Sequence, residues 1–152
     1  MMGTATTDKP VTSLEVSCTK NLLEQYDNMK IMVEDFEEND SDLVQVLREG
    51  RKGELVDVIA KRQLEVYDRY HRIISLIDRA HNAIGNRDTQ KMIEIRYVQG
   101  YSHIKTALYF SGKYSDRTVT RRIKKGIESI AKSLRDWGLF EAYKDLLEQS
   151  NS

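Results

Sequence analysis

The single proline of this chain, Pro10, lies close to its amino terminus. Proline interrupts helices because its ring clashes with the preceding turn and it lacks a backbone N–H group. Everything after position 10 is therefore free to be helical, and the apolar residues there recur three and four positions apart. Clusters of β-branched residues with strand-like alternation are absent. The sequence predicts an all-α fold.

Composition narrows the class of protein. Charged residues make up 32% of the chain and apolar residues 39%. No apolar run approaches the length of a membrane span, and no signal-peptide pattern opens the sequence. We expect a cytoplasmic protein with no membrane partner. The one cysteine, Cys18, excludes an intrachain disulfide and is expected to be a small packing residue.

Signals of catalysis are weak. The three histidines, His71, His81 and His103, lack metal-binding spacing and have no cysteine nearby. Aspartates and glutamates follow helical charge patterns, and the eight glycines are expected at helix ends and near the start rather than in a phosphate-binding loop. We expect no catalytic residue, no metal site and no cofactor, and therefore not an enzyme.

The amino-terminal half predicts two long helices. After a disordered arm over residues 1–11, Thr12 or Ser13 can cap a helix that runs to about Glu38. Its apolar residues are Leu14, Cys18, Leu22, Tyr26, Met29, Val33 and Phe36. A short helix can start at Ser41 and contain Leu43, Val44 and Leu47, before Gly50 and Gly53 interrupt the pattern.

The next long helix is expected from about Glu54 to Ile84. A heptad seam follows it, made of Ile59, Val66, Ile73 and Ala80 with Tyr70, Ile77 and Ile84, and Gln63 as its one polar member. Gly85 and Asn86 supply the stop. We expect residues 12–86 to form a helical hairpin or coiled coil for oligomerisation or partner binding. The seam fits an intramolecular bundle and a homo-oligomer equally well.

The carboxy-terminal half predicts shorter helices. A helix over residues 88–99 ends at Gly100, and Ser102 can cap the next one. The side chains of this helix that are expected to face inward are Ile104, Ala107, Leu108 and Phe110. After a turn over residues 111–114, Ser115 caps a basic helix with an inward face of Val119, Ile123, Ile127, Ile130 and Leu134. Trp137 and Gly138 end it, and residues 139–152 form an amphipathic helix and tail.

Charge is uneven along the chain although its net value is zero. Residues 87–138 hold twelve lysines and arginines against five aspartates and glutamates, whereas residues 1–86 hold eleven against sixteen. A basic block between acidic flanks indicates a local polyanion-binding surface. Two short helices joined by a glycine-containing turn, the second one basic, are typical of a helix-turn-helix. We therefore expect double-stranded DNA as the partner.

The basic helix is the predicted recognition helix. Its first turns, after the Ser115 cap, hold Arg117, Thr118, Thr120 and Arg121, where such helices read base edges. Further along lie Arg122, Lys124 and Lys125, which fit phosphate contacts. The preceding helix opens with Ser102, His103 and Lys105, three weaker candidates for phosphate contacts.

These residues also carry a family resemblance. The chain resembles region four of bacterial sigma factors in three places. These are the run from Tyr97 and Gly100 to Ala107 and Leu108, the segment SDRTVTRRI, and the spacing of Ile127 and Ile130. That region is the helix-turn-helix that reads the promoter −35 element. In layout the chain is similar to phage late transcription regulators of the RinA and ArpU kind. The bulky run of residues 108–110, in place of the family's usual small residue, predicts a longer turn.

The resemblance covers about residues 87–134 and implies a phage or prophage late-gene activator, with RNA polymerase as a candidate partner. Two alternatives remain open. One is a DNA-packaging recognition subunit similar to a phage small terminase, which also joins a helix-turn-helix to an oligomerising hairpin. The other is a helical adaptor that binds only protein.

Overall fold

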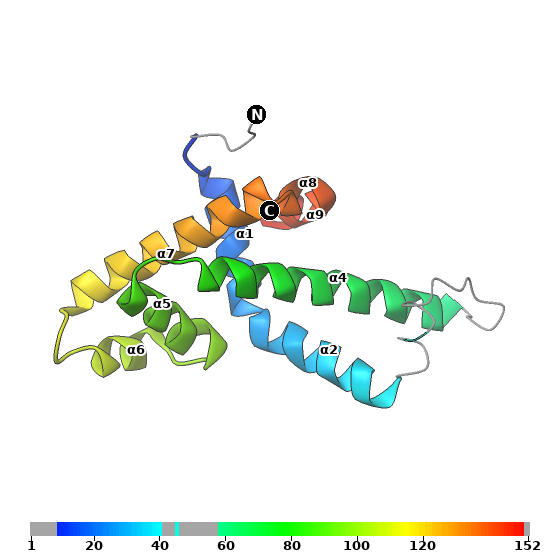
Figure 1. Cartoon of the computed structure of the whole chain (residues 1–152), viewed down its shortest axis with the longest axis horizontal. Coiled ribbons are helices and arrows are strands. Elements are labelled where there is room, and N and C mark those ends of the chain that lie inside the picture. The colour runs from blue at the N-terminus through cyan, green and yellow to red at the C-terminus, as the bar shows by residue number, and fades with distance from the viewer. Residues whose placement is uncertain (1–8, 41–44, 46–57, 151–152) are drawn as a thin grey trace. The chain divides into compact units, whose positions relative to one another are not determined.

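The computed structural model describes residues 9–40, residue 45 and residues 58–150 (Figure 1). Within these ranges the chain forms helices joined by turns, with no strand, so the all-α prediction is confirmed. None of the helices in these ranges has both the length and the apolar content needed to span a bilayer. The short helix expected from Ser41, Gly50 and Gly53, and residues 1–8 of the expected arm lie outside the described residues.

The contacts divide the chain into two compact units, which are described separately. Unit 1 comprises Met1–Tyr26 and Leu76–Ser152, and unit 2 comprises Asp27–Ser75. The first helix packs within unit 1, where it contacts helices of the carboxy-terminal half. The sequence predicts an antiparallel hairpin of the first and third helices, because both are long and one-sided. The part of the predicted first helix that lies in unit 2 runs antiparallel to the third helix (Figure 1).

Helix α1, Ser13–Glu24, begins with the capping box that Thr12 predicts. The Glu15 N–H donates to Thr12 Oγ1 over 3.0 Å, and the Thr12 N–H donates to Glu15 Oε1 over 2.9 Å. The prediction that this helix continues to about Glu38 is wrong. It ends at Glu24, Gln25 is its C-cap, and a second helix, α2 (Tyr26–Asn39), follows. The apolar residues keep their spacing of three and four positions from α1 into α2. Both helices therefore have one apolar face, but α1 buries its face in the core of unit 1 and α2 buries its face in the core of unit 2.

The other helices of unit 1 include the end of α4 (Val58–Asn82), α5 (Arg87–Ile93) and the π-helical turn η1 (Glu94–Val98). Next come α6 (His103–Tyr109), α7 (Asp116–Asp136), α8 (Leu139–Ala142) and α9 (Lys144–Ser150). Helix α1 contacts α7, α9 and η1. The final amphipathic segment is two helices, because Tyr143 leaves the helical region with φ −125° and ψ 65°.

The core of unit 1 is built on α7. All five predicted inward residues, Val119, Ile123, Ile127, Ile130 and Leu134, are buried. The helix ends at Trp137 and Gly138, and Gly138 takes the left-handed conformation with φ 87°, as such a stop requires. The expected glycine pattern is wrong at one place, since Gly126 lies inside α7. A Cβ there would come within 2.9 Å of Ile93, so the glycine lets α5 and α7 approach closely.

Helix α6 turns a different face inward from the one expected. Ile104 is 72% exposed and Leu108 is 65% exposed, whereas Thr106 is buried and Phe110 is buried as expected. Both pairs are four residues apart, so periodicity cannot choose between them. Thr106 tolerates burial because its hydroxyl donates to the Ser102 carbonyl over 2.8 Å. The inward placement of Ile104 and Leu108 was wrong.

Unit 2 contains α2 from residue 27 and the first part of α4, which run antiparallel (Figure 1). Its core comprises Val33, Phe36, Leu64 and Tyr67. The Phe36 and Tyr67 rings stack with centroids 5.1 Å apart, and Tyr67 Oη donates to Glu37 Oε2 over 2.6 Å. Of the heptad seam, Ile73, Ile77, Ala80 and Ile84 are buried, Val66 and Tyr70 are half-buried, and Ile59 is 70% exposed.

Candidate nucleic-acid interface

Helix α7 begins where the sequence placed it. Ser115 is its N-cap, and Ser115 Oγ accepts from the Thr118 N–H over 3.2 Å. Asp116 occupies the first turn, where a carboxylate interacts favourably with the positive end of the helix. The serine and aspartate therefore fix the start of the helix and, with it, the direction of every side chain in its opening turns.

Five predicted site residues share one open hollow on α7. Its lining consists of Arg117, Thr118, Thr120, Arg121 and Lys124. Four of these side chains are exposed and Thr118 is half-buried. Among the described residues no carboxylate lines the hollow, so its three cations face solvent with two hydroxyls between them. Such a surface can accept a polyanion and can donate hydrogen bonds to it.

Arg122 lies on another side of the helix, in a second hollow shared with Lys125, Asn86 and Ser129. Arg122 Nη1 donates to Asn86 Oδ1 over 3.2 Å, and the guanidinium lies 4.6 Å from the centre of the Tyr114 ring. Arg122 therefore joins α7 to the cap of α5. The sequence grouped it with Lys124, but the structure gives it partners within the protein.

The three candidates on α6 have different surroundings. Ser102 caps the helix, and its Oγ accepts from the Lys105 N–H over 3.1 Å. Lys105 is exposed, with its Nζ 5.8 Å from the centre of the Tyr101 ring. His103 faces α7, where its Nε2 lies 3.1 Å from Thr120 Oγ1 and 3.3 Å from Asp116 Oδ1. His103 thus aligns α6 with the opening turns of α7.

Three residues that position α7 were not expected from the sequence. The turn before α7 is fastened to α5 because Lys113 and Tyr114 both donate to Asp88 Oδ2, the lysine over 2.8 Å. The hydrogen bond from Lys113 holds the pKa of Asp88 below its usual value, with Tyr114 adding to the effect. The same contact raises the pKa of Lys113. Some 25 positions separate the partners, so no local pattern reveals the contact.

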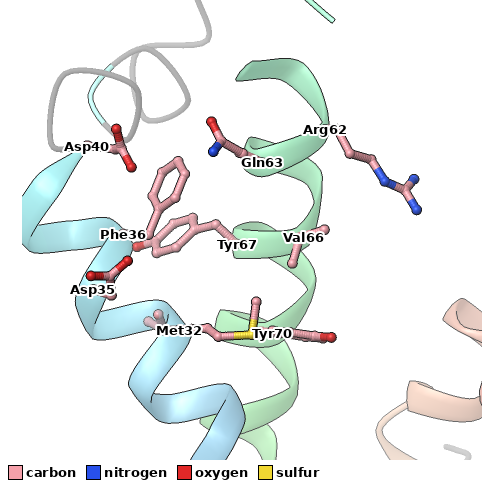
Figure 2. A pocket seen from close by; sticks show the side chains of 10 residues that line it. Met32, Asp35, Phe36, Asp40, Arg62, Gln63, Val66, Tyr67 and Tyr70 are labelled. Atoms are coloured by element: carbon pink, nitrogen blue, oxygen red, sulfur yellow. The ribbon is translucent and has the colours of Figure 1, made fainter. Parts of the chain in front are cut away.

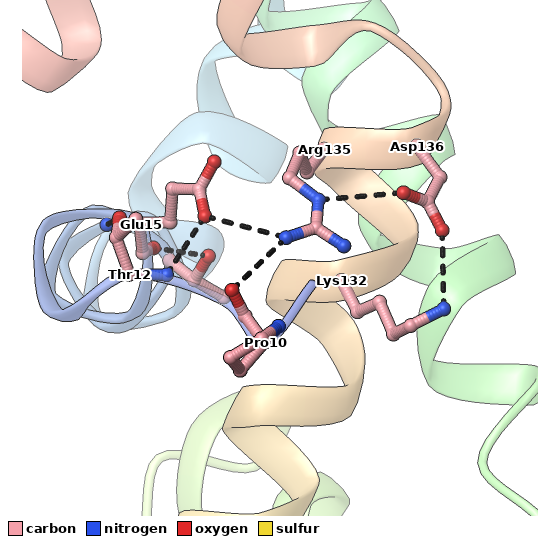
Figure 3. A network of polar contacts seen from close by, with 7 residues as sticks. Pro10, Thr12, Glu15, Lys132, Arg135 and Asp136 are labelled. Carbon is pink, nitrogen blue, oxygen red and sulfur yellow. Dashed lines mark hydrogen bonds and ion pairs between the residues drawn. The ribbon is translucent and has the colours of Figure 1, made fainter. Parts of the chain in front are cut away.

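A polar network holds the other end of α7 (Figure 3). Arg135 Nη1 donates to the Pro10 carbonyl over 3.3 Å and lies 3.8 Å from Glu15 Oε1. Its Nε donates to Asp136 Oδ1 over 3.3 Å, and Lys132 Nζ lies 3.3 Å from Asp136 Oδ2. Part of the expected arm is therefore bound, since Pro10 contacts α7. Together with the Asp88 contacts, this network fixes α7 at both ends.

No family model matches the chain, and no curated protein or solved structure is significantly similar to it.

Proposed function

We propose that this chain is a sequence-specific DNA-binding transcription regulator in which α6 and α7 form the helix-turn-helix. The observation that carries the proposal is the hollow on α7, where Arg117, Arg121 and Lys124 face solvent beside two threonines and no carboxylate. Recognition helices read the major groove with the residues of their first turns, and these are the residues exposed here.

The residues have different roles in this proposal. Arg117 and Arg121, one turn apart, present the bidentate fork that matches the two acceptors of a guanine edge. Thr118 and Thr120 are small enough to let the helix approach the bases. The exposed lysines, Lys124 and Lys125, contact phosphates, which position the protein without reading sequence.

The remaining candidate residues support the recognition helix rather than read bases. Ser102 and Lys105 open α6 and lie where the first helix of the motif crosses the backbone. His103 and Arg122 act from within the protein, since His103 aligns α6 with α7 and Arg122 ties α7 to α5. These two side chains hold the reading surface in place.

Selection of duplexes from a random pool by the full-length protein, followed by fluorescence anisotropy, tests the proposal. The protein should enrich one sequence and bind it with an affinity that falls steeply as salt rises, because neutralised phosphates release counterions. Arg121→Ala with Lys124→Ala should weaken binding by about 100-fold, from roughly 1–3 kcal/mol per lost contact. Failure to enrich any sequence would contradict the proposal.

The matched control removes the same charge elsewhere. Lys20→Ala with Lys144→Ala deletes two exposed cations from α1 and α9, away from the hollow. This variant should bind almost as well as the unaltered protein. If both double variants lose affinity equally, the protein's net charge rather than the α7 surface determines binding.

Within this function we propose a phage or prophage late-gene activator that acts with RNA polymerase in the cytoplasm. Transcription with purified polymerase on a template carrying the selected sequence tests the activation. A packaging subunit similar to a small terminase would instead form ring-shaped oligomers and leave transcription unchanged. The two outcomes separate regulation from packaging even if both proteins bind DNA.

A second candidate function, a helical adaptor that binds protein, is favoured by the exposed apolar residues in and just before α6. Tyr101, Ile104, Leu108 and Tyr109 are all exposed within nine residues, and such clusters mark contact sites on proteins. Ile104→Ser with Leu108→Ser tests it. An activator that contacts polymerase through α6 should keep its DNA affinity and lose activation. An adaptor should show no DNA affinity even at low salt.

A further inference from the structure

Unit 2 has an open hollow between its two helices (Figure 2). It has a volume of about 280 Å³ and mostly apolar walls, with Met32, Phe36, Val66 and Tyr70 among its lining residues. Met32 is 49% exposed at its edge. Two turns before Val66 on the heptad seam, Ile59 is 70% exposed. The seam that is buried from Ile73 onward is therefore uncovered in the first turns of α4.

In the described part of unit 2, α2 and α4 share a small core that leaves two apolar edges exposed. Its buried cluster contains four residues, against which Tyr70 and Ile74 pack half-buried, and the stacked rings of Phe36 and Tyr67 form part of the wall of the hollow. Two helices alone bury little apolar surface, and hairpins of this kind gain stability by packing against further helices. The hollow and the uncovered seam are the places where further helices can pack.

Charge indicates what covers the hollow. Asp35 and Asp40 lie on its α2 side, and Arg62 lies on its α4 side, at the same end as Asp40 (Figure 2). A twofold axis running along the helices sets the α2 side of each copy against the α4 side of the other. This arrangement places Asp40 of each copy opposite Arg62 of the other, and Met32 opposite Tyr70. The charges at this end of the surface are therefore complementary across the axis, where exposed Arg62 also lies 3.6 Å from Glu65 Oε2 of its own helix.

We infer that a second copy of this chain covers the hollow, forming a twofold dimer through α2 and the first turns of α4. The dimer buries Met32 and the uncovered part of the seam and encloses the hollow between four helices. This inference goes beyond the proposed DNA-binding function and does not depend on it, since the α7 hollow lies in unit 1.

Sedimentation equilibrium of the full chain without DNA tests the dimer. Met32→Asp should raise the dimer Kd by about tenfold or more, because it places an unpaired carboxylate in the buried interface. The matched control is Ile31→Asp, the same change at the neighbouring residue, which is 56% exposed and does not line the hollow. The control should leave the Kd within about twofold. Circular dichroism should show that both variants remain helical.

A charge exchange tests the arrangement itself. Arg62→Glu and Asp40→Arg should each weaken self-association, since each places like charges opposite one another twice. An equimolar mixture of the two variants should restore dimers, detected as the mixed species by native mass spectrometry, because both contacts are then of opposite sign.

Three results would overturn the inference. The unaltered protein could remain monomeric up to about 0.1 mM, where a micromolar interface would be almost fully occupied. Met32→Asp and Ile31→Asp could dimerise equally well. The mixed charge variants could fail to form the mixed dimer although the unaltered protein dimerises.

Discussion

Lys113 Nζ lies 2.8 Å from Asp88 Oδ2, and this contact joins the turn before α7 to the first turn of α5. Tyr114 donates to the same carboxylate oxygen, so one aspartate holds two consecutive residues of the turn. The position of the proposed recognition helix therefore depends on a residue of a different helix.

We expect Asp88 to make stability depend on pH in the acid range. Its folded-state pKa lies below the ordinary value of 3.8, so its contribution is fully present above about pH 4. The contribution is lost as pH falls through the lower, folded-state pKa. Asp88→Asn should flatten the acid side of a plot of Tm against pH, and Lys113→Met should remove most of the same dependence. An unchanged plot for both variants would show that the carboxylate does not hold the turn.

Gly126→Ala should destabilise the protein by about 1–3 kcal/mol, the usual range for overpacking a well-filled core. The new Cβ would lie 2.9 Å from Ile93 Cγ1 and 3.1 Å from Thr89 Cγ2, so the buried Ile93 side chain or α5 itself would have to shift. Urea unfolding measures the change. The control is Gly112→Ala, where a Cβ meets nothing within 4 Å. If Gly126→Ala raises stability instead, the helical preference of alanine outweighs the close approach.

Arg135→Ala should cost about 1–3 kcal/mol of unfolding free energy, because it leaves Glu15 largely buried without its cation. The side chains of Arg135 and Glu15 are only 17% and 14% exposed. Lys132→Ala removes an exposed partner of Asp136 from the same turn and should cost only about 0–1 kcal/mol. If thermal unfolding shows that both variants lose the same stability, the contact between Arg135 and Glu15 does not stabilise the protein.

Arg121→Ala and Lys125→Ala should affect DNA binding differently. Loss of the arginine should weaken binding to the selected sequence by roughly 1–3 kcal/mol and relax the choice of base at one position. Loss of the lysine should weaken all sequences alike and reduce the salt slope by about one unit. Specific and random duplexes at two salt concentrations separate these effects. Equal weakening of both duplexes by Arg121→Ala would assign this arginine to phosphate.

The sequence predicted features that depend on neighbouring residues. Thr12, Ser102 and Ser115 cap helices as expected, since a cap contacts only the next few residues. The inward stripe of α7 follows from spacing alone. The π-helical turn at Glu94–Val98 was not predicted; within it Ile95 is buried and Arg96 is half-buried.

Features that depend on distant residues could not be predicted. Asp88, Lys113 and Tyr114 meet across 25 or more positions, and Gly126 matters only because Ile93 lies against it. On α6 the spacing allowed two inward faces, and the rest of unit 1 buries the one with Thr106. The sequence did identify Arg117, Thr120 and Arg121 as exposed residues of α7, because exposure follows directly from the position of the inward stripe.

The contact of α1 with α7 has a consequence for synthesis of the protein. A ribosome makes α1 long before α7 and α9, the helices that cover its apolar side. Until those segments emerge, Leu22 and Leu23 have no core to enter. Contacts between such distant segments slow folding and leave apolar surface open to aggregation. The nascent chain should therefore be a client for chaperones that bind short apolar helices, until α7 arrives and closes the unit.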